Sequence, residues 1–214
     1  MPLLTNNCFF QNAFDGYILH GRGQCLAGID YDGGVPATTF KPLQGGNIVV
    51  LDDPAFDPVT GRPTGNGFPD PCDTSFFSVL STIGIDGSIL ECRDVNLSAN
   101  SELRFTWAFL PLESHTSNCF NSFALFVAYD QDDLGSAGDF ANATPTYTTV
   151  LGQSKNIPDS SRQNICWQVS CWQPQQNFSG TLYWIVSTGA FAQTNSHCRP
   201  SMLLLDSVEV NSRV

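Results

Sequence analysis

The residues best suited to binding a ligand lie around Trp172. In the strand predicted over 165–172, Trp172 shares one face with Gln168 and Ser170, because alternate side chains of a strand point the same way. Tyr183 falls between core positions of the following strand and could lie beside Trp172. An aromatic ring with polar neighbours can stack on a sugar, so Trp172, Tyr183 and Gln168 are the predicted ligand-binding residues. The alternative is a tryptophan that a neighbouring loop covers.

The acidic residues favour calcium over catalysis. Asp outnumbers Glu by sixteen to four, and Asp-rich loops such as 130–145 offer the oxygen ligands that calcium prefers, although they also form ordinary turns. Glu113 and His115 lie close to two serines in a predicted loop. This cluster is better explained as a group of solvated polar residues than as a catalytic triad. No hydrolase, phosphate-loop or dinucleotide motif occurs. We therefore predict that the chain is not an enzyme; a glycan-active enzyme with paired carboxylates is an alternative.

The composition excludes several partners. Nine Lys and Arg residues against twenty acidic ones leave a net charge of −11, and no basic patch is visible. Neither nucleic acid nor an anionic membrane surface is therefore an expected partner, and no stretch is long enough to span a bilayer. Charged residues make up only 14% of the chain, against roughly 25% in typical soluble domains. Such a surface suits an ordinary secreted domain or one that self-associates.

An even number of cysteines is typical of disulfides formed in an oxidising compartment. No pair has the spacing of a zinc site, so we expect Cys8–Cys25 and Cys72–Cys92 bonds, with the other four cysteines paired between strands. Free buried thiols are the alternative. The predicted location is extracellular or at the cell surface, against a cytosolic or viral origin, although the opening residues MPLLTNN lack the pattern of a signal peptide. The eight residues are Cys8, Cys25, Cys72, Cys92, Cys119, Cys166, Cys171 and Cys198.

The stretch 101–130 predicts the centre of the fold. Period-two alternation of large apolar residues marks a half-buried strand, and here two such sets flank a polar loop. The prediction is a hairpin of two strands side by side, with one apolar face that a second sheet must cover. The two sets are Leu103, Phe105, Trp107 and Phe109, and then Phe123, Leu125, Val127 and Tyr129.

The rest of the chain repeats this pattern. It predicts about ten short strands and no helix. No linker or internal repeat divides the chain, so the prediction is a single antiparallel jelly-roll β-sandwich over residues 1–214, with several disulfides. Long loops are expected at 51–73, 112–121 and 130–145, and residues 1–7 are expected to form an extended polar arm.

Three stretches resemble the galactose-binding-like jelly-roll modules of secreted bacterial adhesins and carbohydrate-binding proteins. Segment 7–17 resembles the motif N-x-x-F-E-x-G-x-x-x-G-W, segment 101–129 resembles L-x-F-x-W-x-F-L-x-x-E followed by N-D-F-A, and segment 203–210 resembles L-L-D-N-V-x-V. They lie at the start, middle and end of the chain, so the resemblance spans it. It implies a non-catalytic module that binds carbohydrate or another surface, often with a structural calcium.

The resemblance also implies where calcium would bind. In these modules a carboxylate of the first strand and the Asp of the last strand contribute to the ion. Asp206 matches the last-strand residue, and Gln11 stands in place of the first-strand carboxylate. Glutamine supplies a neutral oxygen instead of a charge. The implied ligands are therefore Asp206 and Gln11; a capped strand end is the alternative explanation for Asp206.

Two functions of different kinds follow from the sequence. The first is an extracellular binding or adhesion module that recognises a glycan or another cell-surface or matrix component, assisted by calcium. The alternative is a structural subunit of an extracellular filament, sheath or shell that self-associates into polymers. The low charge motivates this alternative, in which the arm of residues 1–7 would complete the sheet edge of a neighbouring subunit.

Overall fold

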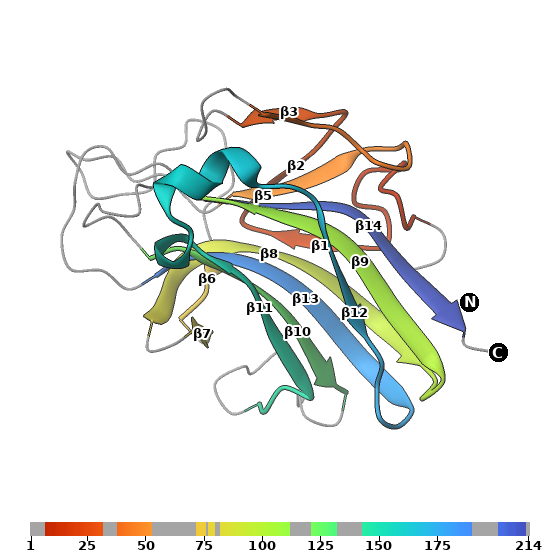
Figure 1. The fold of residues 1–214 in the computed structure, drawn as a ribbon. Coiled ribbons are helices and arrows are strands. Elements are labelled where there is room, and N and C mark those ends of the chain that lie inside the picture. Colours follow the sequence, from red (N-terminus) through yellow and green to blue (C-terminus); the bar gives the residue numbers. More distant parts are fainter. Residues whose placement is uncertain are drawn as a thin grey trace.

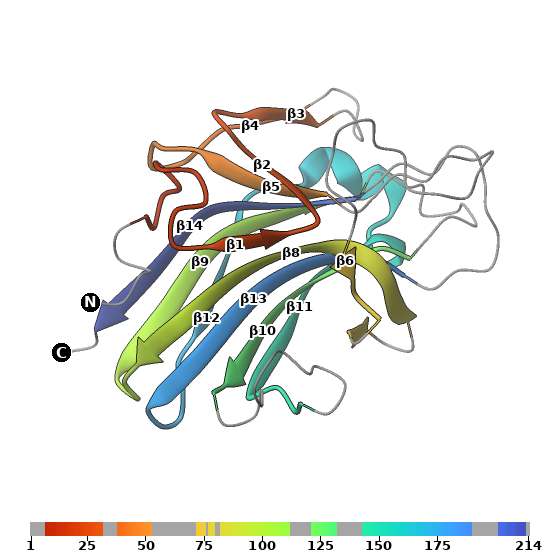
Figure 2. The ribbon, with the colours of Figure 1, turned by 180° about the vertical axis from the view of Figure 1, so that it is seen from behind.

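The computed structural model describes residues 7–31, 38–52, 72–75, 77–79, 82–111, 121–131, 143–189 and 201–212. Two antiparallel sheets face each other (Figures 1 and 2). The seven-stranded sheet contains β1 (Ile18–His20), β6 (Cys72–Asp73), β7 (Ser78–Val79), β8 (Thr82–Leu97), β10 (Phe123–Asp130), β11 (Tyr147–Gln153) and β13 (Phe178–Gly189). The five-stranded sheet contains β2 (Arg22–Leu26), β5 (Ile48–Asp52), β9 (Ser101–Leu110), β12 (Gln168–Trp172) and β14 (Met202–Ser212).

The remaining elements are short. A separate hairpin is formed by β3 (Ile29–Tyr31) and β4 (Thr38–Phe40), and its apolar residues pack on the outer face of the five-stranded sheet. Two 3-10 helices, η2 (Ser154–Asn156) and η3 (Asp159–Asn164), connect β11 to β12. Within the described part of the chain, no helix has the length and apolar character needed to cross a membrane.

The strand order is that of a jelly roll. The five-stranded sheet has the order β12-β9-β14-β5-β2, and the main path of the seven-stranded sheet is β1-β8-β13-β10-β11. Strands β5 and β8 to β14 therefore divide into two sets of four, between which the chain passes back and forth. This connectivity is that of an eight-stranded jelly roll built from two Greek keys. The predicted antiparallel β-sandwich is confirmed.

The predicted central hairpin is wrong in its pairing. Strands β9 and β10 lie within the stretch that predicted them, but β9 pairs with β12 and β14, whereas β10 pairs with β11 and β13. They lie opposite each other across the core, where the ring centroids of Phe105 and Phe126 are 4.8 Å apart. Alternation alone cannot distinguish neighbouring strands from facing strands, because both arrangements bury one face of each strand.

Strand β10 is buried on both faces. The set of side chains that was predicted to face the core between the sheets lies instead on the outer face of the seven-stranded sheet. Ala124, Phe126 and Ala128 point into the main core between the sheets. The set that begins with Phe123 instead forms a second cluster on the outer face of the seven-stranded sheet, with Tyr183 and other residues. On β9 the prediction is confirmed, because Leu103, Phe105, Trp107 and Phe109 all lie in the main core.

The opening segment consists of turns, although the resemblance implied that Gln11 belongs to the first strand. Residues 7–16 form successive turns in which Phe10 and Ala13 have positive φ. The Asn7 side chain stabilises them by donating to the carbonyl oxygens of Ala13 and Asp15, each at 2.9 Å. Only β1 is extended here. Most of the predicted long loops and of the arm lie outside the described residues, at 1–6, 53–71, 112–120 and 132–142.

The predicted disulfide pairs are wrong where the structure describes them. Cys8, Cys25 and Cys92 have unbonded thiols, so neither the Cys8–Cys25 bond nor the Cys72–Cys92 bond is present. Cys92 points into the main core, where its thiol donates to the carbonyl of Gly16 at 3.8 Å and burial raises its pKa to about 12. An even number of cysteines does not indicate which of them lie close enough to form a disulfide. Of the other four, Cys166 has an exposed, unbonded thiol, Cys171 is exposed on β12, and Cys119 and Cys198 lie outside the described residues.

Candidate functional site: a pocket at one end of the sandwich

A pocket of about 530 Å³ lies where β10 and β12 end and β11 and β13 begin. These strand ends are at the lower end of the view in Figure 1. Its volume lies in the range typical of small-ligand sites. Three segments that are separated in sequence contribute to it, at 130, 146–147 and 172–178, so it exists only in the folded chain. The lining residues are Asp130, Thr146, Tyr147, Trp172, Gln173, Pro174, Gln175, Gln176, Asn177 and Phe178.

Stacked aromatic rings form the apolar wall of the pocket. The rings of Trp172 and Tyr147 are nearly parallel, with centroids 5.4 Å apart and an interplanar angle of 18°. Phe178 meets Trp172 edge-on at 5.0 Å, and Trp172 also approaches Phe126 of the main core at 6.1 Å. Because the wall is continuous with the core, it is a rigid apolar surface.

The connection between β12 and β13 is attached to the neighbouring β8–β9 turn by two hydrogen bonds. The Ala99 N–H donates to Asn177 Oδ1 at 3.1 Å, and Gln173 Nε2 donates to the Ala99 carbonyl at 2.8 Å. Pro174 follows directly and lacks the N–H that a continuing strand needs, which explains why β12 ends at Trp172. Two side-chain amides of the pocket therefore hold its wall in place.

Asp130, at the end of β10, is the carboxylate among the residues that line the pocket. The Asp130 N–H donates to Thr146 Oγ1 at 3.0 Å, and the next residue, Gln131, donates its N–H to the Ser179 carbonyl at 2.8 Å. These bonds fix the end of β10 against β11 and β13. The exposed amides of Gln175 and Gln176 complete the polar lining, which contains no Lys, Arg or His among the lining residues named above.

The structure separates the three predicted ligand-binding residues. Trp172 lines the pocket but is only 6% exposed, because the ring of Tyr147 stacks on it. It does share the inward face of β12 with Ser170, whose Oγ accepts a hydrogen bond from Trp107 Nε1 at 2.9 Å. This polar face was misleading because β12 is an edge strand, where the inward side reaches the rim of the core. Gln168 is exposed and lies outside the pocket lining.

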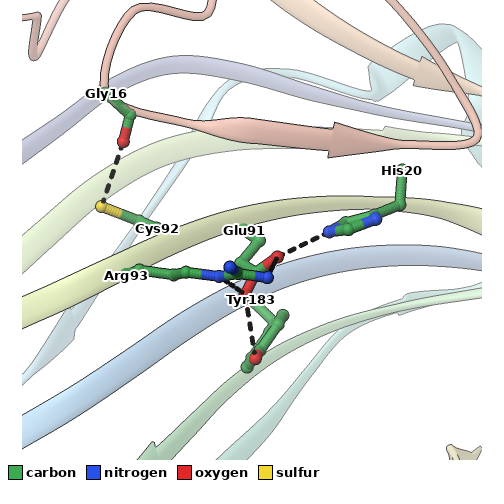
Figure 3. Close-up of polar contacts among 6 residues, drawn as sticks. All are labelled: Gly16, His20, Glu91, Cys92, Arg93 and Tyr183. Carbon is green, nitrogen blue, oxygen red and sulfur yellow. Dashed lines mark hydrogen bonds and ion pairs between the residues drawn. The ribbon is translucent and has the colours of Figure 1, made fainter. Parts of the chain in front are cut away.

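Tyr183 does not lie beside Trp172, contrary to the prediction. It is 3% exposed in the cluster on the outer face of the seven-stranded sheet, whereas Trp172 belongs to the main core. Its hydroxyl donates to Glu91 Oε1 at 3.3 Å (Figure 3). Burial, followed by the Glu91 charge, raises the pKa of Tyr183.

Glu91 is the centre of a charged cluster on this outer face (Figure 3). Its carboxylate lies 2.5 Å from His20 Nε2 and accepts hydrogen bonds from Arg93 at 2.5 and 3.1 Å. Burial alone would raise the pKa of Glu91, but hydrogen bonds and charge from Arg93 and His20 outweigh burial and lower it. A carboxylate held ionised in this way is a poor general acid, so the cluster stabilises the sheet.

Asp206 is the residue most suited to a cation. It lies at a bulge in β14, where the pairing register with β9 shifts between Leu205 and Ser207, and it is 0% exposed. Its Oδ1 accepts the Leu43 N–H at 2.9 Å, while its Oδ2 has no hydrogen-bond partner. Burial raises the pKa of Asp206. A buried carboxylate oxygen without a partner is compensated by a proton or by a cation.

Gln11 lies near the same turn that contacts Asp206. It is exposed in the turns of 7–16 rather than on a strand. Turn 43–46 donates a hydrogen bond to Asp206 at one end, and at its other end a Cβ added to Gly46 would lie 3.3 Å from Gln11 Cγ. The structure thus brings the neighbourhoods of the two implied calcium ligands together through this turn. Within the described residues, no group of three His, Cys, Asp or Glu side chains gathers around them.

Sequence reasoning missed most of the pocket. Tyr147 and Asp130 belong to strands whose positions relative to Trp172 no local pattern reveals. The run Gln-Pro-Gln-Gln-Asn at 173–177 directly follows Trp172, and this combination of amides with an aromatic ring was the available signal.

No protein-family model matches this sequence, and no curated protein sequence matches it. Similar solved structures include a family 61 carbohydrate-binding module in complex with β-1,4-galactotriose, at 11% identity over 100% of this chain and 99% of that one, with a TM-score of 0.43. Another is a cleaved adhesin domain of Lys-gingipain from Porphyromonas gingivalis, at 14% identity over 96% of this chain and 97% of that one, with a TM-score of 0.41.

A third similar structure contains the binding and catalytic modules of a Clostridium thermocellum endo-1,4-β-D-xylanase, in complex with xylohexaose. The identity is 13% over 97% of this chain, the TM-score is 0.40, and the match covers 28% of that longer chain. Carbohydrate-binding modules and secreted adhesin domains are the two classes that the sequence resembled.

Proposed function

We propose that this protein is a non-catalytic binding module that holds a saccharide in the pocket beside Trp172, outside the cell or at its surface. The observation that carries the proposal is that the stacked Trp172–Tyr147 pair lines one pocket together with residues that bear side-chain amides and with Asp130. Sugars present apolar C–H faces and rings of hydroxyls, so they need aromatic surface and polar groups together. A glycan of a cell surface or matrix is the partner that this lining fits.

The way the walls are fixed supports binding by a preformed site. Trp172 packs on the main core, and the two bonds to Ala99 hold the β12–β13 connection. A site that is ordered before the ligand arrives loses less entropy on binding. Only the exposed amides of Gln175 and Gln176 then remain to be ordered by the ligand.

The test uses these exposed amides, because alanine at the buried Trp172 would disturb the fold. We expect titration calorimetry against galacto-, xylo- and chito-oligosaccharides to detect binding by the unaltered protein. The double variant Gln175→Ala with Gln176→Ala should raise Kd by roughly 2- to 10-fold for each lost hydrogen bond. Gln24→Ala, an exposed amide on the opposite edge strand β2, is the matched control.

Two outcomes would contradict the proposal: no saccharide binds the unaltered protein, or the double variant binds as well as the Gln24→Ala control. The role of Gln168 in binding stays a prediction. Gln168→Ala in the same titration decides it, and since Gln168 lies outside the pocket lining we expect no change in Kd.

We also propose that calcium binds at Asp206, with Gln11 near the site. The buried Oδ2 without a partner supports this, and calcium would supply the positive charge that a desolvated carboxylate lacks. Calcium should raise the melting temperature of the unaltered protein, and chelation should lower it. Asp206→Asn should abolish this response, with Asp30→Asn as the exposed control. A melting temperature that does not respond to calcium would indicate a protonated Asp206.

A structural subunit remains a second candidate because of two exposed strand edges. Strands β11 and β12 end their sheets, and each exposes a valine: Val150 is 50% and Val169 is 49% exposed. Unpaired strand edges can add a strand from another subunit. Light scattering with negative-stain microscopy separates the candidates: regular polymers favour a subunit, and a monodisperse particle near 23.3 kDa favours the binding module.

A further inference from the structure

We infer that the side of the sandwich formed by β11 and β12 binds a second copy of this chain edge to edge, so that both sheets continue across a two-fold axis. The inference goes beyond the proposed functions, because it does not depend on the saccharide pocket and gives a closed pair rather than a polymer. It is carried by a row of apolar side chains that ends at this side, by the composition of the two edge strands and by the charge of the molecule.

The apolar row crosses the outer face of the seven-stranded sheet. Ile89 of β8 pairs with Ile185 of β13, which in turn pairs with Leu125 of β10. Leu125 then pairs with Val150 of β11, and side chains that are directly opposed on neighbouring strands contact each other. The first three residues are at most 5% exposed, whereas Val150 is 50% exposed. The row therefore stops at a side chain that one further strand would cover.

The two edge strands lack the features that normally prevent association. Among the described strands, β11 pairs with β10 alone and β12 with β9 alone, so both strands end their sheets. Charges and prolines usually protect such edges, but neither Tyr147–Gln153 nor Gln168–Trp172 contains a charged residue or a proline. On the opposite side of the sandwich, β1 contains His20 and β2 contains Arg22. Strand β12 also exposes an apolar side chain, Val169, to 49%.

Charge and geometry identify the partner as a second copy of this chain. Two copies with a net charge of −11 repel each other, and a two-fold axis brings the same surface of both together. Residues 143–154 and 163–178 contain no charged side chain, so this side meets itself without that penalty. The two edges lie side by side, since Tyr147 of β11 stacks on Trp172 of β12. Because a second copy has the same spacing, a two-fold axis perpendicular to the strands pairs β11 with β11 and β12 with β12, both antiparallel.

The size of the contact predicts a weak association. Strand β11 has seven residues with Val150 at its middle, so the longest pairing of two copies places Val150 opposite Val150 of the second copy. At about 3.4 Å per residue the strand is about 24 Å long, and the two sheets are about 10 Å apart. The contact is then on the order of 300 Å² per copy, below the roughly 800 Å² of a stable complex. The protein is therefore expected to be a monomer in dilute solution.

Sedimentation equilibrium of the unaltered protein tests this contact. We expect a mass near 23.3 kDa at about 1 μM, which rises toward twice that value, and not beyond it, as the concentration approaches about 1 mM. Added salt should favour the dimer, because it screens the repulsion between two acidic copies. Hydrogen exchange at high concentration should show added protection within Tyr147–Gln153 and Gln168–Trp172, because their outward N–H groups become hydrogen-bonded.

A pair of matched variants locates the contact. Val150→Glu places like charges against each other at its centre and should raise the dissociation constant of the dimer by roughly 10-fold or more. Ile18→Glu is the control, because Ile18 is 40% exposed on β1, toward the other edge of the same sheet, and gains the same charge. It should change the dissociation constant by less than about 2-fold. Urea unfolding checks that the variants fold, and Val169→Glu on β12 replaces Val150→Glu if that variant does not.

Three results would overturn the inference. A mass that stays near 23.3 kDa up to about 1 mM would exclude the contact, while the proposal of a saccharide pocket stands. A mass that rises beyond twice this value would show open-ended association instead of a closed pair. If Val150→Glu associates as well as Ile18→Glu, or if protection is gained only outside β11 and β12, the copies associate through another surface.

Discussion

Replacing Asp52 by asparagine is expected to stabilise this protein at neutral and alkaline pH and to leave its stability unchanged in acid. Asp52 is the last residue of β5 and pairs with Arg22 of β2 and Met202 of β14. Burial raises the pKa of Asp52 from 3.8 to about 6, although Arg22 opposes this shift. The folded protein therefore holds a carboxyl group that is harder to ionise than in the unfolded chain.

The magnitude follows from these two pKa values. They differ by about 2, and one pKa unit corresponds to about 1.4 kcal/mol, so ionising Asp52 costs the folded state about 3 kcal/mol. Because the folded-state pKa is the higher of the two, the stabilisation by the protonated group is complete below pH 3.8 and is lost as the pH rises through about 6. The asparagine side chain has no such proton to lose, so the advantage of the Asp52→Asn variant should grow over the same interval.

Urea unfolding of both proteins at several pH values measures this difference. We expect Asp52→Asn to unfold with a free energy up to about 3 kcal/mol higher above about pH 7, and within about 0.5 kcal/mol of the unaltered protein near pH 4. Asp30→Asn, at an exposed site, should stay within about 0.5 kcal/mol throughout. A difference that does not change with pH, or an asparagine variant that is less stable at high pH, would refute the reasoning.

Three further substitutions test the packing. Trp172→Ala should lower the free energy of unfolding by about 3–5 kcal/mol because it opens a cavity beside the core, and urea unfolding near the wild-type value would contradict its burial. Glu91→Gln should lower the free energy of unfolding by about 1–3 kcal/mol at neutral pH, because it removes a charged hydrogen-bond acceptor. Since the pKa of Glu91 is lowered in the folded protein, the stabilisation by its carboxylate is present above the ordinary pKa of 4.5 and is lost as the pH falls through the folded-state value. A penalty that persists in strong acid would contradict this account. Gly46→Ala should lower the melting temperature, because Gly46 has φ of +86° and an added Cβ would overlap the Phe9 carbonyl oxygen; Gly45→Ala, with φ of +80° but open space around it, separates the clash from the backbone strain.

The individual strands could be predicted because strand formation leaves a local trace. The alternation of Phe105, Trp107 and Phe109 on β9, and of Leu182, Trp184 and Val186 on β13, corresponds to the inner faces that the structure shows. Side chains of a strand alternate with a period of two whatever lies opposite them. Such information is contained in a few consecutive residues.

The alternation of side chains could not predict which strands pair with each other, nor that β10 is buried on both faces. Phe126 fills the main core between two alanines, whereas the larger set of apolar residues on β10 packs on the outer face. The polar neighbours of Trp172 likewise did not reveal its burial, since Tyr147 of another strand stacks on its ring. In each case the deciding contact comes from residues far along the chain.

The sequence by itself determined that the chain forms an antiparallel β-sandwich, which residues point into the core on β9 and β13, and that Trp172 lies beside a run of amides. Only the tertiary structure decided which strands are neighbours, which thiols lie too far apart to bond, and that Tyr147 and Asp130 join Trp172 at one pocket. The physical reason is that side-chain alternation and turn formation depend on adjacent residues, whereas pairing, burial and pockets depend on which distant segments the fold brings into contact.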